Sequence, residues 1–346
     1  MNFNKKLAQV SYIERGKIMR KLVKKLAAFM LCGVVAVTSC LTGCGSTSSE
    51  VIIYSNADDE AIESMKAALD ENGYEGKYII QTFGTSELGG KLLAEGKNIE
   101  ADLVTMSSFY LESSEAENKM YQELTFETGA IEEYPSYYTP ITSQEGAIIV
   151  NTEVMAENNL TMPTSIKDLA NPEYKGFLSV TDIQSSSTAW LLIQALVSEY
   201  GEDGAKEVLT GIYENAGDHI EDSGSGPIKK VRTGEVAIGF GLRHQAVSDK
   251  KEGLPIDFVD PTEGNFALTE SVAVINKGDD TNEQVMEMAE CIIKNGRDKL
   301  ITYYPNPLYE GETADETNIS AYPKTFAEKL TAELLEKHKE LSESCK

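Results

Sequence analysis

The sequence predicts an α/β protein built from two lobes. Short apolar runs alternate with amphipathic helical segments along the chain, which is typical of strands joined by helices in a parallel sheet. The chain has 346 residues and exceeds the usual size of one hydrophobic core, even without residues 1–43. Three turns rich in Ser, Thr and Gly each follow a predicted strand, which indicates a binding site at one edge of the sheets.

The first lobe is predicted to begin at residue 51 and to continue to residue 140. Strands are predicted at 51–55, 78–81 and 101–105, and helices from Asp58 to Gly73 and at 87–95. Asp58, Asp59 and Glu60 lie in the first turn of the first helix, where acidic side chains interact favourably with the helix dipole.

The second lobe is predicted over residues 141–264, and residues 265–346 return to the first lobe and end in C-terminal helices. Strands are predicted at 147–150, 177–180, 237–240 and 271–275, and helices at 189–197, from Pro227, at 282–293 and at 326–341.

Residues 1–43 have the pattern of a signal peptide. Basic residues at 20–25 precede the apolar segment 26–37, which is too short to span a bilayer. The small residue Gly43 precedes Cys44, so we expect cleavage there and attachment of lipid to Cys44. Residues 44–50 would then form a lipidated polar tether. Cleavage before Cys40 and an uncleaved anchor helix are the alternatives.

The strong acidity of the chain limits its partners. The formal net charge is −25, and residues 1–43 hold more basic than acidic side chains, so the remainder is more acidic still. Nucleic acid and anionic membrane surfaces would be repelled by such a protein. A small anionic ligand would need a local site that opposes the overall field.

The sequence offers little support for an enzyme or a metal protein. Beyond Cys44 the cysteines are Cys291 and Cys345, which allow one disulfide and no zinc site. The chain has three histidines and lacks a G-x-S-x-G elbow, a Walker loop, and a G-x-G-x-x-G sequence after a strand. We therefore expect no catalytic residue, no metal and no cofactor.

The three Ser/Thr/Gly turns are candidate anion sites. They lie at 84–86, 185–188 and 223–227. The first amides of a helix lack backbone partners and the helix dipole is positive there, so a phosphate or phosphonate oxygen can bind without a buried cation. Pro227 suits the first position of a helix. The alternative for each turn is ordinary N-capping by Ser or Thr.

Charged residues next to these turns could complete the site. Arg243 and His244 follow a glycine-containing strand, and the planar guanidinium of Arg243 suits a phosphonate or carboxylate, although a surface ion pair is the alternative. Asp58 could receive a ligand ammonium group or could simply cap its helix.

Four stretches resemble the extracellular solute-binding proteins of ABC importers. They are residues 54–61, 101–104, 171–176 (Asn-Pro-Glu-Tyr-Lys-Gly) and 234–239, and the likeness extends over nearly the whole chain after residue 50. The branch concerned includes binders of ferric ion, thiamine, 2-aminoethylphosphonate and sugar phosphates. The resemblance implies the type II periplasmic-binding-protein fold, in which two α/β lobes joined by crossing strands close on a ligand.

The turns and the resemblance together give a set of candidate ligand-binding residues. They are Asn56, Asp58, Thr85, Ser86, Ser107, Ser186, Ser187, Thr188, Ser223, Gly224, Ser225, Arg243 and His244. Iron-binding relatives use a His, a carboxylate and two adjacent tyrosines. In this chain, the positions that resemble those ligands are Asp58, Ser107 and residues 242–244. None of them is a tyrosine, whose ionised phenolate would suit ferric ion.

The expected function is capture of a small organic anion for import, most simply a phosphonate such as 2-aminoethylphosphonate or a phosphate ester. The expected partners are that anion, an ABC permease and the membrane that holds the lipid anchor, with the protein acting as a monomer outside the cytoplasmic membrane. Binding of ferric ion, thiamine or a polyamine is the alternative within this class. A secreted phosphatase-like enzyme and a sensor lobe are alternatives from other classes.

Overall fold

The computed structural model describes residues 50–313 and 315–346, and one mixed sheet organises them. The strands lie in the order β2-β1-β3-β9-β4-β7-β5-β6, with β10 paired to β9 and β8 paired to β4. Their bounds are β1 Val51–Ser55, β2 Tyr78–Thr82, β3 Leu103–Ser107, β4 Tyr138–Asn151, β5 Leu178–Thr181, β6 Ile220–Glu221, β7 Ile238–Leu242, β8 Ile256–Val259, β9 Asn265–Val274 and β10 Pro323–Lys324.

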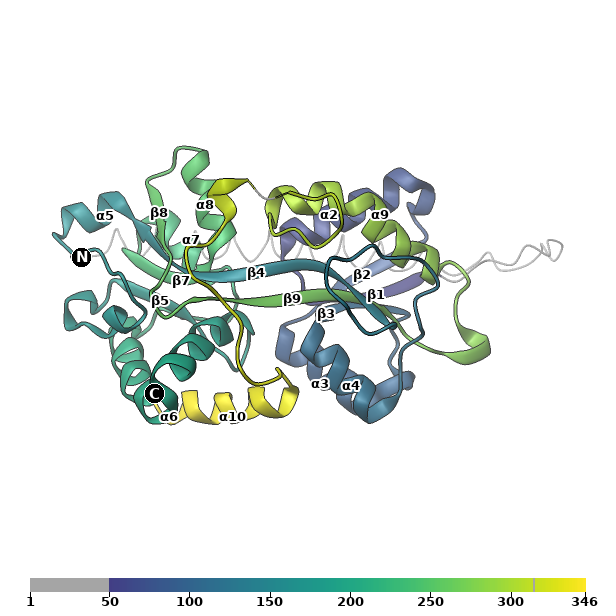
Figure 1. Cartoon of the computed structure of the whole chain (residues 1–346), viewed down its shortest axis with the longest axis horizontal. Coiled ribbons are helices and arrows are strands. Elements are labelled where there is room, and N and C mark those ends of the chain that lie inside the picture. Colours follow the sequence, from purple (N-terminus) through teal and green to yellow (C-terminus); the bar gives the residue numbers. More distant parts are fainter. Residues whose placement is uncertain (1–49, 314) are drawn as a thin grey trace, which may run out of the picture. The chain divides into compact units, whose positions relative to one another are not determined.

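Helices surround both ends of this sheet (Figure 1). Their bounds are α2 Asp59–Leu69, α3 Thr85–Glu95, α4 Ser108–Asn118, α5 Thr152–Glu157, α6 Thr188–Ala216, α7 Gly226–Thr233, α8 Arg243–Lys251, α9 Val285–Tyr303 and α10 Ala332–Glu343. None of the helices found at residues 50–346, residue 314 aside, has the length and apolar composition that crossing a bilayer requires.

The sheet defines two lobes. In the first lobe β1 pairs in parallel with β2 and β3, and α2, α3, α4 and α9 cover it. In the second lobe β5 pairs in parallel with β6 and β7, and α5 to α8 surround these strands. Apolar side chains such as Val51 and Ile53 in β1 and Leu178 in β5 are fully buried, which explains why these short runs form strands.

Two long strands connect the lobes. β4 pairs with β9 over its first half and with β7 over its second half, and all these pairings are antiparallel. β9 also pairs with β3 of the first lobe, again in the antiparallel direction. Figure 1 shows β4 and β9 passing between the two groups of helices, so the two-lobed α/β architecture predicted from the sequence is confirmed. β4 begins at Tyr138 and β9 at Asn265, next to the predicted boundaries between residues 140 and 141 and between residues 264 and 265.

The C-terminal helix differs from the prediction. A helix was expected from Phe326, but α10 begins at Ala332 because Thr331 caps it and accepts a hydrogen bond from the Leu334 amide. α10 packs mainly on α6 of the second lobe, where the Trp190 indole donates to His338 Nδ1 at 2.7 Å. It also reaches α4, through the Ala332 amide and Ser113 Oγ at 3.0 Å.

Helix α6 extends from Thr188 to Ala216, far beyond the predicted 189–197. Gly201, in a left-handed conformation at φ 69°, interrupts it.

Cys291 and Cys345 are buried free thiols, so they form no disulfide with each other. The predicted signal peptide, the tether and Cys44 lie outside the described residues, apart from Glu50.

Candidate ligand-binding cleft

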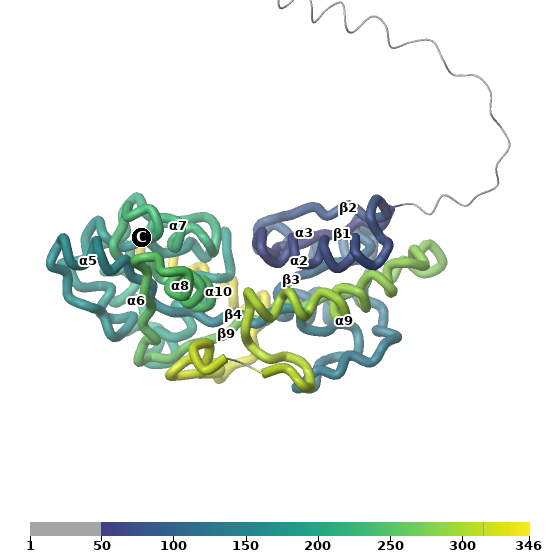
Figure 2. Tube along the Cα trace, turned by 90° about the horizontal axis from the view of Figure 1, so that it is seen from above, coloured from purple at the N-terminus to yellow at the C-terminus, as the bar shows by residue number. Residues whose placement is uncertain are grey.

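A cavity of about 370 Å³ lies between the two lobes. Its walls are formed by residues that follow the carboxyl ends of β1, β2, β5, β6 and β7, together with Gln144 of β4 and Glu270 of β9. Open α/β sheets bind ligands at this edge of their strands. Figure 2 shows the two groups of helices on either side, with β4 and β9 between them. We call this cavity the cleft.

Hydroxyl groups dominate the wall that the second lobe contributes. Ser187 and Thr188 begin α6, and Ser223 and Ser225 precede α7. The N-cap residues Ser187 and Ser225 do not cap their own helices with their side chains. Across the residues described, none of these four hydroxyl groups has a hydrogen-bond partner within the protein. They are therefore available to a ligand, unlike ordinary capping hydroxyls.

Gly84 and Gly224 allow the chain segments around the cleft to approach one another closely. A Cβ atom at Gly224 would overlap Oγ1 of Thr188 and would lie 3.0 Å from the Thr188 Cβ, so glycine allows the two turns of the second lobe to touch. A Cβ atom at Gly84 in the first lobe would lie 3.6 Å from the Ser185 carbonyl oxygen in the second lobe. The two lobes thus approach each other at Gly84.

Two cations line the second-lobe wall. Lys229 of α7 is exposed and forms no ion pair with any residue that the structure describes. Arg232, one turn further along α7, donates from Nε to Asp249 Oδ2 at 2.7 Å and from Nη2 to Oδ1 at 2.9 Å. Asp249 thus already neutralises Arg232, and Lys229 is the cation that remains for a ligand anion.

Acidic groups face the cleft from the first lobe and the connecting strands. Asp58 caps α2, accepting from the Ala61 amide at 3.3 Å, and also accepts from the Tyr304 hydroxyl. Burial raises the pKa of Asp58, and the nearby Glu60 and Asp59 add to the rise. Burial likewise raises the pKa of Glu270 to about 7, although the hydrogen bond from the Ser107 hydroxyl opposes the rise.

Nine of the thirteen candidate residues lie together around the cleft. They are Asn56, Asp58, Thr85, Ser186, Ser187, Thr188, Ser223, Gly224 and Ser225. The other four, Ser86, Ser107, Arg243 and His244, do not line it. Ser107 nevertheless contacts a cleft residue, because its hydroxyl donates to Glu270 Oε1 at 2.6 Å.

Arg243 lies away from the cleft, contrary to the expectation that it faces the ligand. Its side chain is buried and donates to both carboxylate oxygens of Asp260, at 2.8 and 3.2 Å, and to the carbonyls of Thr317 and Ile319. The preceding residue, Leu242, ends β7 and lines the cleft together with Gln245, three residues further on. Arg243 is the first residue of α8 and faces another side of that helix. His244 is half-buried outside the cleft, with its ring 4.6 Å from that of Tyr304.

Sequence reasoning missed several cleft residues. Glu270 precedes the predicted strand 271–275 by one residue, and an acidic side chain at the start of an apolar strand was the available signal. Lys229 and Arg232 lie one and two turns into the helix that begins near Pro227, on the side that faces the cleft. Gln144 and Gln245 carried no sequence signal.

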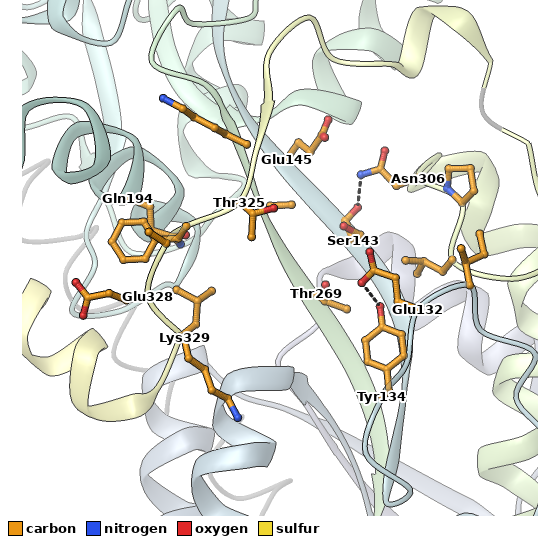
Figure 3. Close-up of a pocket in the computed structure, with 18 residues that line it drawn as sticks. Glu132, Tyr134, Ser143, Glu145, Gln194, Thr269, Asn306, Thr325, Glu328 and Lys329 are labelled. Carbon is orange, nitrogen blue, oxygen red and sulfur yellow. Dashed lines mark hydrogen bonds between the residues drawn. The ribbon is translucent and has the colours of Figure 1, made fainter.

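A larger cavity of about 620 Å³ lies on the other face of the connecting strands (Figure 3). Ser143 and Glu145 of β4 and Thr269 of β9 line it, and residues 324–330 border it. Gln144 and Glu270, which alternate with these residues, face the cleft instead. None of the thirteen candidate residues lines the larger cavity, and it does not lie where the parallel strands end, so the cleft is the candidate functional site.

Comparison with known proteins gives the family. Residues 101–295, more than half of the chain, match the model of the bacterial extracellular solute-binding proteins. The chain belongs to this family and is a solute-binding protein. An uncharacterised protein of Haemophilus influenzae is 25% identical over 252 residues, which cover 69% of this chain and 72% of that relative.

Solved structures share the fold. The periplasmic binding protein AfuA from Actinobacillus pleuropneumoniae, with fructose-6-phosphate bound, is 19% identical with a TM-score of 0.66, and the match covers 80% of this chain and 90% of AfuA. Iron-bound HitA from Pseudomonas aeruginosa is 18% identical with a TM-score of 0.66 and coverages of 86% and 99%. These likenesses extend to the fold of both lobes and do not identify a ligand.

Proposed function

We propose that the protein captures a small organic anion, a phosphonate or a phosphate ester, and delivers it to the permease of an ABC importer. The observation that carries the proposal is the set of four uncommitted hydroxyl groups at the starts of α6 and α7, which face one cavity together with Lys229. Hydroxyls, helix N-terminal amides and a lysine supply the donors that a phosphoryl oxygen needs.

The proposed location is outside the cytoplasmic membrane, with a lipid anchor at Cys44 and the protein acting as a monomer. The basic segment, the apolar segment and the small residue before Cys44 support the anchor from the sequence. Membership of an extracellular solute-binding family fits the same location.

The proposal predicts a specific loss when Lys229 is replaced. Lys229→Gln should weaken binding of a phosphonate or phosphate ester by about 10- to 100-fold, because a charge-assisted hydrogen bond contributes about 1.5–3 kcal/mol and about 1.4 kcal/mol corresponds to tenfold. The measurement is titration calorimetry with 2-aminoethylphosphonate, a hexose phosphate, thiamine and ferric citrate.

Lys230→Gln is the matched control. Lys230 is the next residue on α7, but it pairs with Glu221 at 3.5 Å and Glu235 at 2.6 Å and does not line the cleft. The Lys230→Gln variant should bind the phosphonate or phosphate ester with wild-type affinity. A wild-type protein that responds only to thiamine or ferric citrate would contradict the proposal.

A further inference from the structure

The two walls of the cleft carry opposite charge. The first-lobe wall contributes Asp58, Asp59 and Glu60, and Glu270 of β9 lies beside them. The second-lobe wall contributes Lys229, Arg232 and the hydroxyl groups, with Asp222 as its acidic member. A ligand with negative charge alone would be attracted by one wall and repelled by the other.

Glu270 is the most informative group on the acidic side. Only 8% of its surface is exposed, and its Oε1 accepts from Ser107 at 2.6 Å. Its Oε2 is buried, and no residue in the described part of the chain hydrogen-bonds to it. A buried acceptor without a partner is costly, so this oxygen is ready for a donor from outside the protein.

Two more buried oxygens in the cleft lack partners among the described residues: Oδ1 of Asn56 and Oε1 of Gln245. Asn56 uses its amide nitrogen to donate to Thr85 Oγ1 at 3.2 Å, which leaves Oδ1 as an acceptor. The unmet need inside the cleft is therefore for hydrogen-bond donors. An ammonium group supplies three donors and a positive charge, whereas a phosphoryl group supplies mainly acceptors.

We infer that the ligand is a zwitterion of the aminoalkyl phosphonate or phosphate class, and that Glu270, with Asp58 beside it, binds its ammonium group. This inference rests on the proposed function, because it assigns the phosphoryl group to the hydroxyls of the second lobe. The ammonium group then lies against the acidic wall. Binding one ligand thereby satisfies both walls and brings the lobes together.

The ionisation of Glu270 gives the inference a second consequence. With a pKa of about 7 in the folded protein against an ordinary value of 4.5, the neutral acid favours folding at low pH, and this contribution is lost as the pH rises through 7. Asp58 adds to the raised pKa through its charge. A bound ammonium group stabilises the carboxylate, so binding should displace the proton from Glu270.

The test compares 2-aminoethylphosphonate with ethylphosphonate, which lacks the amine. The wild type should bind the aminated compound at least tenfold more tightly. Glu270→Gln should weaken binding of 2-aminoethylphosphonate at least tenfold and leave ethylphosphonate bound as well or better. Calorimetry at pH 7 in buffers of different ionisation enthalpy should show proton release when the wild type binds 2-aminoethylphosphonate, and Glu270→Gln should release fewer protons, because only the wild type can lose the Glu270 proton.

Glu145→Gln is the matched control. Glu145 lies on β4, its pKa is also raised by burial, and it lines the cavity on the other face of the connecting strands. The Glu145→Gln substitution should change neither the affinity for 2-aminoethylphosphonate nor the proton release. Equal wild-type affinity for the two phosphonates would overturn the inference while leaving the proposed function intact. Failure of every phosphonate and phosphate ester to bind would overturn the proposed function and the inference with it.

Discussion

Ligand binding is expected to be lost when Gly84 is replaced by Trp and to be kept when it is replaced by Ala. Gly84 precedes α3 with φ −64° and ψ 150°, a conformation that any residue adopts, so neither substitution strains the backbone. A Cβ atom here has one neighbour within 4 Å, the Ser185 carbonyl oxygen at 3.6 Å in the other lobe. Alanine therefore fits, whereas an indole would fill the cleft or hold the lobes apart.

Two measurements check this prediction. Calorimetry with a phosphonate should show no detectable heat for Gly84→Trp and wild-type affinity for Gly84→Ala. Small-angle scattering should show compaction on ligand addition for the wild type and Gly84→Ala only, because a hinged pair of lobes gains contacts from both sides by closing. Compaction of the Trp variant with wild-type affinity would show that the ligand does not bind between Gly84 and Ser185.

Gly224→Ala should weaken binding by at least tenfold. The new Cβ would overlap Oγ1 of Thr188 and approach the Ser186 hydroxyl to 3.4 Å, so the hydroxyl cluster would have to move. Overpacking of this kind costs about 1–3 kcal/mol, which is enough to displace the groups that hold the ligand. Calorimetry gives the affinity and urea denaturation gives the stability.

Two further variants separate displacement from misfolding. Gly90→Ala makes the same change in α3, where a Cβ atom has no neighbour within 4 Å, and should bind normally. Thr188→Ala removes the hydroxyl without adding volume and should weaken binding several-fold while the protein stays folded. Normal affinity of both Gly224→Ala and Thr188→Ala would exclude this cluster from the site.

Local sequence patterns predicted the elements that surround the cleft. The strands at Val51–Ser55 and Leu178–Thr181 and the helix at Pro227 were predicted because apolar runs and helix-start residues are local signals. Parallel strands carry their following turns to the same edge of a sheet, so the Ser/Thr/Gly turns met at the cleft. The strands, the helix start and the meeting of the turns can therefore be predicted without knowledge of tertiary contacts.

The direction of individual side chains was harder to predict. Arg243 is the first residue of α8, directly after the end of β7, and it faces away from the cleft although Leu242 and Gln245 line it. Its partner Asp260 lies 17 residues further along, and its carbonyl partners at Thr317 and Ile319 are more distant still. Such an ion pair depends on how separate segments pack, which no local pattern reports.

The length of α6 and the start of α10 were missed for related reasons. The predicted helix at 189–197 covered only the fully apolar part of α6, although helical residues continue past Gly201 to Ala216. Phe326 and Leu330 have helical spacing with Leu334, yet they pack against the core in a segment that is not helical, where the Phe326 ring lies 6.2 Å from that of Phe266. Packing decided the conformation there.

The most direct test of the account is to identify the compound that the cleft retains. The purified protein is incubated with a bacterial metabolite extract, washed and denatured, and the released compound is analysed by mass spectrometry and by a phosphorus assay. The account predicts one phosphorus-containing organic anion per protein molecule, with Lys229→Gln retaining less of it and Lys230→Gln as much as the wild type. Recovery of iron, or of a cation without phosphorus such as a polyamine, would contradict the account.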